Sequence, residues 1–140
     1  MLFDFATINW LAVLSAGLIA FLVGAVWYTA LFGTLWIKLH GFSETKVKEM
    51  QANMSPPRFF GGMVLSYLVL ALALAVLLTG FSEPNATTGI GVGLVVWLAA
   101  AAIAMTGHIA SDKVYGLYLI DVGCQLVYLV LMGALLGAWR

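Results

Sequence analysis

The chain alternates between long apolar runs and short polar breaks. Four runs take up most of it: Asn9–Ile37, Phe59–Phe81, Thr88–Ala110 and Tyr115–Trp139. A helix needs about 20 predominantly apolar residues to cross a hydrocarbon core of about 30 Å, and each run is long enough. The pattern therefore predicts an all-α integral membrane protein, a four-helix transmembrane bundle that forms a single domain over residues 1–140.

Composition supports this prediction independently of the pattern. Hydrophobic residues make up 64% of the chain and charged residues 9%, whereas soluble domains carry about 25% charged residues. The longest polar stretch, Lys38–Arg58, is too short for a soluble domain. The net charge is zero, so no basic surface is expected to neutralise the phosphates of a nucleic acid. The lipid bilayer is the expected partner.

The first apolar run is interpreted as a membrane span. Met1–Ile8 carries Asp4 and no Lys or Arg, and the run that follows is longer than the apolar core of a signal peptide. We therefore expect no cleaved signal peptide.

The distribution of basic residues predicts an orientation. Five of the six fall between runs one and two or between runs three and four, and the sixth, Arg140, ends the chain. The positive-inside rule then places loops one and three in the cytoplasm and both termini outside a bacterial inner membrane. Dual topology stays open, because one or two charges decide orientation in small proteins. The five basic residues are Lys38, Lys46, Lys48, Arg58 and Lys113.

Loop one contains the pattern of a short amphipathic helix. Ser43 is a candidate N-cap, and Val47, Met50 and Met54 recur at helical spacing. Pro56-Pro57 would end this segment and start the second span, since proline is tolerated in a first turn. The helix would lie on the inner membrane surface. A solvated connector fits equally well.

Small residues predict where the helices touch, because close packing drives association in lipid. The fourth run ends with a GxxxG pair, which favours packing within the monomer over a dimer seam. Small residues on the first and third runs predict that these two helices are central to the bundle. The predicted packing residues are Ala12, Ala16, Ala20 and Gly24, then Ala100 and Ala104, then Gly133 and Gly137.

The candidate chemistry lies at the inner end of the third and fourth runs. An antiparallel hairpin there would place His108 and Asp121 at similar depth, and Asp121 shares a helix face with Gln125. A charge at mid-membrane costs about 2.5–3.5 kcal/mol. The predicted polar cluster comprises His108, Asp112, Asp121 and Gln125 with Trp27 and Tyr28 of the first run.

Three interpretations of Asp121 are open. It is satisfied by His108, Tyr28 or a backbone group and locks the hairpin; or it forms a carboxylate–imidazole pair that carries protons or binds a cation; or it faces the lipid interface. Asp112 and Lys113 are read as turn residues, and His40 as a loop residue without a local partner. Cys124 is the single cysteine and is read as a packing residue. No metal, cofactor or catalytic motif is predicted.

The first third of the chain carries a recognisable order of residues. It reads Gly24-Ala-Val-Trp27-Tyr28, then Leu31-Phe32-Gly33, Trp36 and a turn at Gly41-Phe42-Ser43-Glu44. This order, with the length and helix layout of the whole chain, resembles the bacterial domain-of-unknown-function 1761 family of small four-helix membrane proteins. The resemblance implies the architecture and leaves the function open.

Two functional hypotheses follow. The first is a homo-oligomeric transporter or channel for protons or small cations, with its pathway between subunits. The second is a non-catalytic accessory or scaffold subunit of a larger membrane complex. A lipid-modifying enzyme ranks below both, because His108 and Asp121 are its only candidate acid–base pair.

Overall fold

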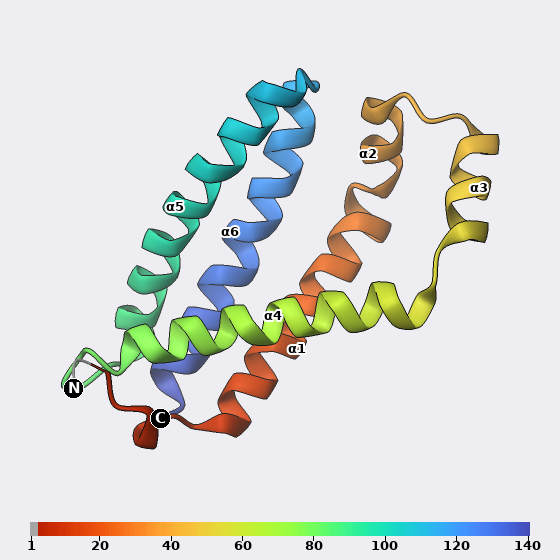
Figure 1. Ribbon diagram of the computed structural model, residues 1–140. Helices are drawn as coiled ribbons and strands as arrows, with labels where there is room; N and C mark the ends of the chain where they lie inside the picture. The colour runs from red at the N-terminus through yellow and green to blue at the C-terminus, as the bar shows by residue number, and fades with distance from the viewer. Residues whose placement is uncertain (1–2) are drawn as a thin grey trace.

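Four helical segments of the protein are long and apolar enough to span a membrane. A computed structural model describes residues 3–140. Met1 and Leu2 lie outside the described residues; they belong to the segment Met1–Ile8, on which the expectation of no signal peptide rests. The spans are Trp10–Leu31, Pro56–Leu78, Ala86–Ser111 and Tyr115–Ala138, which confirms the predicted helical membrane bundle. In chain order the elements are η1 (Phe5–Thr7), α1 (Trp10–Val26), η2 (Trp27–Leu31), α2 (Gly33–His40), α3 (Glu44–Asn53), α4 (Pro56–Leu78), α5 (Ala86–Ser111) and α6 (Tyr115–Ala138) (Figure 1).

The first apolar run does not form one continuous helix, so the prediction of a single helix over Asn9–Ile37 is wrong. Asn9 starts α1, and its side chain accepts hydrogen bonds from the next turn. At η2 the helix widens to a π-turn, in which the Phe32 amide donates to Trp27 O over 2.8 Å. A Cβ on Gly33 would lie 2.6 Å from Tyr28 O, so the chain turns into α2 at a glycine. Single π-turns of this kind occur frequently at functional sites.

The other helix ends follow local signals in the sequence. Ser43 caps α3 by accepting from the Lys46 amide over 3.1 Å, which confirms the predicted short helix in loop one. Pro56 starts α4, as predicted from the two prolines that precede the apolar run at Phe59, because proline needs no amide partner in a first turn. Asp112 ends α5 with a left-handed backbone, φ 50°.

Helices α5 and α6 form the closest pair in the molecule. A Cβ on Gly89 or Gly133 would collide with the backbone carbonyl of the other residue, so neither helix tolerates a side chain there. Gly137 likewise packs against Asn85 O, and Gly93 against Leu129 O. The Gly133/Gly137 pair is therefore used inside the monomer.

The helix at the centre of the bundle is α6, and the prediction that helices one and three are central is wrong for the third. In the apolar stretch of α6, 39% of the residues are buried, compared with 33% in the first span (α1 with η2) and 17% in α5. Ala100 and Ala104 of α5 are only partly exposed but do not form its closest contact, which runs through Gly89, Gly93 and Ala101. The reason is that α5 packs mainly on α6, with a smaller contact to α4, so its remaining faces stay open.

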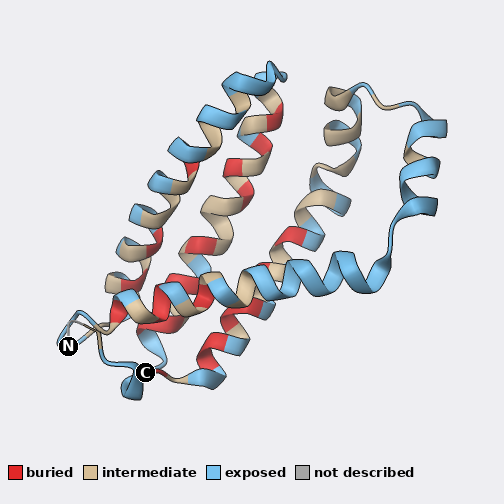
Figure 2. Ribbon diagram, in the orientation of Figure 1, coloured by how far each residue is buried: buried red, intermediate tan, exposed pale blue. Residues whose placement is uncertain are grey.

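The packed core occupies one half of the molecule. The described start of the chain and the carboxyl terminus lie at the same end, called here the termini end; the opposite end holds α2, α3 and the α5–α6 turn and is called the α3 end (Figure 1). Buried residues gather toward the termini end, where α1, α4 and α6 meet (Figure 2). They include Ala12, Ala16 and Ala20 of α1, Leu74 and Leu78 of α4, and Leu129 and Met132 of α6.

Toward the α3 end the helices separate. In Figure 1, α4 runs across α1 and leaves the α5–α6 pair, so that its first half stands apart from them. Residues 56–66 of α4 are all exposed. This divergence opens space between α4, α3 and the upper half of α6.

Candidate functional site

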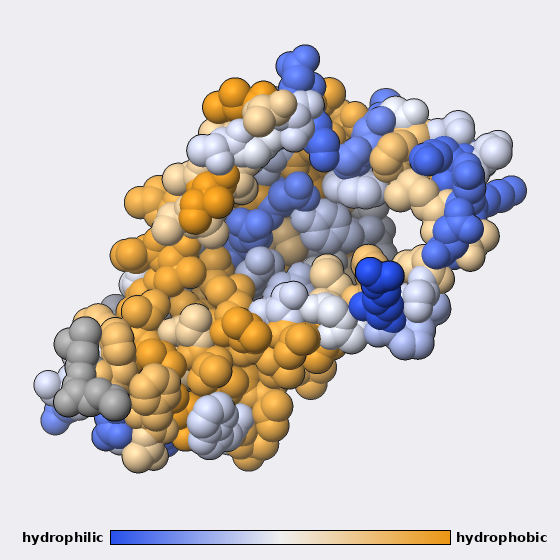
Figure 3. Space-filling view, viewed as in Figure 1, coloured by the Kyte–Doolittle hydropathy of each residue, from blue (hydrophilic) through white to orange (hydrophobic). Residues whose placement is uncertain are grey.

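The space between the diverging helices is a groove of about 1070 Å³. Its walls come from α1, η2 and α2 on one side, α5 and α6 on the other, and α3 with the first half of α4 in front. Figure 3 shows hydrophilic side chains inside this hollow, while the surface over α5 and over the termini end of the molecule is mostly hydrophobic. The groove thus gathers polar side chains that belong to membrane-span helices.

Asp121 is the carboxylate of this groove. It lies on α6, and its Oδ1 accepts a hydrogen bond of 2.6 Å from the Tyr28 hydroxyl on η2. The π-turn at η2 is what brings Tyr28 into line with α6. The structure therefore joins two members of the predicted cluster that are 93 residues apart.

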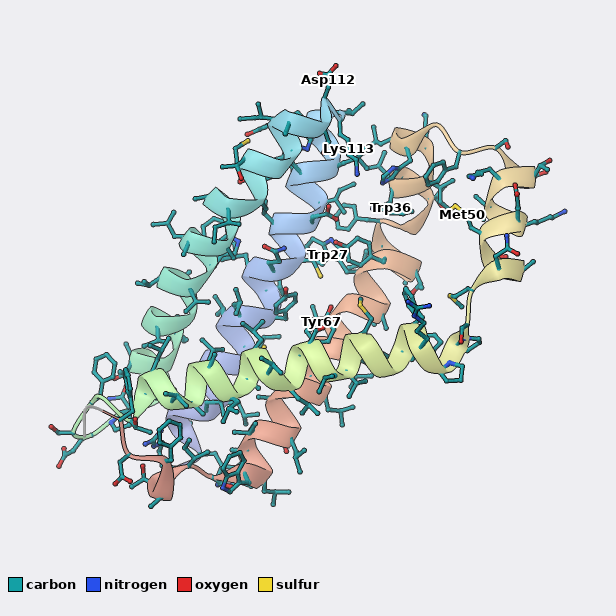
Figure 4. The ribbon with its side chains drawn as sticks, viewed as in Figure 1. Trp27, Trp36, Met50, Tyr67, Asp112 and Lys113 are labelled. Atoms are coloured by element: carbon teal, nitrogen blue, oxygen red, sulfur yellow. The ribbon has the colours of Figure 1, made fainter. Side chains whose placement is uncertain are left out.

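Two tryptophans fix the α6 backbone on either side of Asp121. Trp27 Nε1 donates to Ile120 O over 3.0 Å, and Trp97 Nε1 donates to Val122 O over 2.8 Å. The Trp27 ring also lies over Gly123, where an added Cβ would sit 3.2 Å from Cζ2. Figure 4 shows Trp27 between α1 and α6. These contacts hold the position of the carboxylate without using its oxygens.

His108 lines the groove but is not the hydrogen-bond partner of Asp121. Its ring packs against Tyr118 and Tyr115, with centroids 5.5 and 6.0 Å away. Tyr118 in turn donates to Ala101 O over 2.9 Å, which ties the hairpin together. The carboxylate–imidazole pair that we considered is replaced by the Tyr28–Asp121 pair, because η2 reaches α6 at this depth.

Asp112 lies outside the cluster, and its predicted membership is wrong. It occupies the exposed α5–α6 turn, and Figure 4 shows it at the tip of the hairpin, pointing away from the groove. The left-handed backbone at this position explains why: the turn projects its side chain outward. The neighbouring Lys113 does line the groove, at its α3 end.

Gln125 carries an unsatisfied acceptor. It lies one helical turn after Asp121 on the same face, and both line the groove. Its Oε1 is buried and has no hydrogen-bond partner among the described residues. A buried acceptor left without a donor costs about 1–3 kcal/mol. Asp121 is therefore the acceptor that faces the groove, whereas the Gln125 oxygen is sealed off from it and unpaired.

The charges at the α3 end are close enough to influence each other. His40 ends α2 and stacks on Phe42, with centroids 4.8 Å apart, and its ring packs at a tilt against Trp36, with centroids 4.1 Å apart. The expectation that it has no local partner is therefore wrong. Burial lowers the pKa of His40, the nearby Lys113 lowers it further, and Asp121 acts in the opposite direction. His40 thus lies within electrostatic range of both groups.

Several groove residues were not predicted from the sequence. Tyr67 of α4 and Tyr128 of α6 meet edge to face, with centroids 5.3 Å apart, and Tyr67 Oη would lie 2.9 Å from a Cβ on Gly24. Tyr67 and Tyr128 each place a hydroxyl within an apolar run of the sequence, and this polar group is the feature from which they could have been predicted. Cys124 is buried and also lines the groove, which fits its interpretation as a packing residue.

The groove does not have the ligand set of a metal centre. Among residues 3–140, no three His, Cys, Asp or Glu side chains gather closely enough to hold a metal ion. The polar groups that do gather are a carboxylate, an amide, and tyrosine and histidine rings. This set suits hydrogen bonding and contact with a cation over aromatic faces.

Comparison with known proteins adds a family but no activity. No curated protein and no solved structure matches the chain significantly. The family described as "Protein of unknown function (DUF1761)" matches residues 11–137, which covers all four spans apart from their outermost residues. The chain, a small multi-pass membrane protein, therefore belongs to the domain-of-unknown-function 1761 family.

Proposed function

We propose that this protein is a small transporter that takes a proton or a small cation into the groove at Asp121. The observation that carries the proposal is the position of this carboxylate. It lies within a membrane span and faces a groove of about 1070 Å³ that reaches the α3 end. Ionisable side chains in spans are rare and commonly mark ion or substrate pathways.

The asymmetry of the bundle supports the same function. Toward the termini end, the core of α1, α4 and α6 closes the molecule with fully buried alanine, leucine and methionine side chains. Toward the α3 end the helices diverge. A site accessible from one side and closed on the other is what a transporter presents in one of its two states.

Orientation and assembly complete the proposal. With five basic residues at the α3 end, the positive-inside rule opens the groove to the cytoplasm in a bacterial inner membrane. Passage through the closed half requires either a rearrangement of the α1–α4–α6 core or a second copy beside it, so we include a homo-oligomer. No enzymatic step is proposed, because Asp121 pairs with Tyr28 and not with an imidazole base.

Flux through proteoliposomes tests this function. Wild-type protein is reconstituted and proton or monovalent cation flux is recorded under an imposed gradient. We expect Asp121→Asn to lower the flux at least tenfold, because it removes the charge and preserves the shape. Asp112→Asn is the matched control: it removes a carboxylate from the same hairpin, at the exposed turn, and should leave the flux unchanged. Equal flux from wild type, Asp121→Asn and empty liposomes would reject the proposal.

A second candidate is a non-catalytic subunit of a larger membrane complex. The observation that favours it is the open face of α5, which exposes Leu94, Val95, Leu98, Ile103 and Ile109. Purification from its native membrane in mild detergent separates the two proposals. A stable complex with a different membrane protein supports the accessory subunit, and recovery of a self-associated species alone counts against it.

A further inference from the structure

We propose that the groove holds a phospholipid with an anionic headgroup. The phosphate lies at the α3 end of the groove, beside Lys113, His40 and His108, and an acyl chain follows the apolar wall formed by α3 and the first half of α4. This site goes beyond transport at Asp121 and does not depend on it. Three features carry the proposal: the charges at the α3 end, the apolar wall, and the opening of the groove within a membrane span.

Three nitrogen-bearing side chains line the groove where it reaches the α3 end. Lys113 comes from the α5–α6 turn, His40 from the end of α2 and His108 from the last turn of α5. Burial lowers the pKa of His40 and the charge of Lys113 lowers it further, so these two side chains lie within electrostatic range of each other. Lysine ammonium and neutral imidazole groups both donate N–H bonds, and charge-assisted bonds to phosphate are strong. We call these three residues the polar mouth; it suits an anionic group.

The acidic residues of this end of the molecule do not line the polar mouth. Asp121, the acidic residue in the lining of the groove, lies deeper, within the α6 span, and accepts from Tyr28. Glu44, Glu49 and Asp112 share the α3 end, but all three are exposed and none lines the groove. Five of the six basic residues of the chain also lie at this end. The charge at the polar mouth is therefore positive, which attracts the anionic lipids of a cytoplasmic leaflet.

The apolar wall of the groove is built from α3 and the first half of α4. Its large apolar side chains are Val47, Met50, Met54, Phe59, Phe60 and Met63. Figure 4 shows Met50 on the side of α3 that faces α2. The three members on α4 each leave more than a third of their surface exposed. An alkyl chain covers this apolar surface, and flexible methionine side chains adapt to its shape.

The first half of α4 opens the groove to the bilayer. Residues 56–66 belong to the span Pro56–Leu78 and are all exposed, and this half of α4 stands apart from the α5–α6 pair (Figure 1). An acyl chain in the leaflet at the α3 end can enter there sideways, while its headgroup stays beside Lys113 at the top of the hairpin (Figure 4). A free phosphate would leave the apolar wall uncovered in a groove of about 1070 Å³. The shape and the charges together favour a membrane lipid.

Native mass spectrometry of the whole protein tests the proposal. Protein purified in a non-ionic detergent is titrated with dioleoylphosphatidylglycerol or with the zwitterionic dioleoylphosphatidylcholine, and the lipids bound per chain are counted. We expect one phosphatidylglycerol per chain, bound about fivefold more tightly than phosphatidylcholine, because a basic side chain at the membrane surface raises the affinity for an anionic lipid by about this factor. Equal affinity for the two lipids would overturn the proposal.

Two lysine variants separate a defined site from general attraction to a basic surface. Lys113→Gln should abolish the preference for phosphatidylglycerol. Lys38→Gln is the matched control, because Lys38 is exposed at the same end and does not line the groove; it should keep the preference. Both lysines are exposed, so both variants should melt like wild type, which verifies that they are folded. An equal loss of preference in the two variants would contradict a site at the polar mouth.

A photoactivatable diazirine in the acyl chain of phosphatidylglycerol locates the bound lipid. We expect crosslinks within residues 47–63 and none on the open face of α5, where Val95 and Leu98 are more exposed than the α4 residues of the apolar wall. Crosslinks spread over both regions would reject the site, as lipid then coats the protein without preference. Competition by glycerol phosphate would assign the polar mouth to a free phosphate, and a dimer without lipid would place a second copy in the groove; either result rules the proposal out. None of these measurements depends on flux.

Discussion

Asp121 illustrates how a polar residue is accommodated within a membrane span. Its oxygen receives the Tyr28 hydroxyl at 2.6 Å, and its backbone neighbours accept from Trp27 and Trp97. Hydrogen bonds between spans are worth about 0.6 kcal/mol on average and up to about 1.7 kcal/mol, and a buried acceptor that loses its donor costs more. At the scale of single residues, one aromatic hydroxyl offsets part of the cost of the carboxylate.

Replacement of that hydroxyl gives a direct prediction. Tyr28→Phe leaves Asp121 without its donor, and we expect the free energy of unfolding to fall by about 1–3 kcal/mol. Thermal or denaturant unfolding in detergent micelles measures the change. Tyr115→Phe is the control, because Tyr115 is exposed at the helix start and should unfold like wild type. A loss that is no larger for Tyr28→Phe than for Tyr115→Phe would show that the pair does not stabilise the fold.

Individual helices of this protein differ in what they contribute. The α5–α6 pair is held by glycines whose backbones touch, as expected for lipid-embedded helices that associate through close packing. The first span is interrupted instead: its π-turn and Gly33 redirect the chain and aim Tyr28 at α6. At the scale of elements, the α5–α6 pair provides a rigid contact, and the irregular first span supplies Tyr28 to the site.

A pair of glycine substitutions on α5 tests the rigid contact. Gly89→Ala places a Cβ against the Gly133 carbonyl, which is backbone and cannot rotate away, so we expect a destabilisation of about 1–3 kcal/mol. Gly91→Ala lies on the same helix with open space around it, and removing a helical glycine there should stabilise by up to about 1 kcal/mol. Melting temperatures of both variants measure the effects. Equal melting temperatures would mean that the helices are not in contact at Gly89.

The whole molecule is divided into a closed half and an open half. The closed half at the termini end contains the buried core, and the open half at the α3 end contains the groove and five of the six basic residues. The open side of the protein is therefore also its basic side, and the positive-inside rule predicts that this side faces the cytoplasm.

Cysteine labelling in intact cells tests this orientation. With Cys124 replaced by alanine, Ser55→Cys reports the α3 end and Ser82→Cys the α4–α5 turn; both positions are exposed. We expect a membrane-impermeant maleimide added outside to label Ser82→Cys and to leave Ser55→Cys unlabelled until the cells are opened. The reverse pattern would invert the topology, and labelling of both positions from outside would indicate dual insertion.

Much of the fold was predictable because its determinants are local. The four spans follow from the length of their apolar runs, and α3 follows from the Ser43 cap and the helical spacing after it. The break at η2 was missed, because the residues of a π-turn are as apolar as those of a regular helix and Gly33 alone does not signal it. Hydropathy measures transfer into lipid and not the path of the backbone.

The site was predicted as a region, and only its contacts required the fold. The polar interruption at Asp121 and Gln125 is visible in the apolar pattern, since every such residue is costly in a span. The partner of Asp121 is not visible in that pattern, because Tyr28 and His108 are both candidates from the sequence. The packing of α1 on α6 places Tyr28 against the carboxylate, while His108 packs against Tyr118. The divergence of α4, which opens the groove, also depends on contacts between distant segments. By itself the sequence determined which segments cross the membrane and which residues are costly there; tertiary structure decided which of those residues meet, because contacts between spans depend on how whole helices pack.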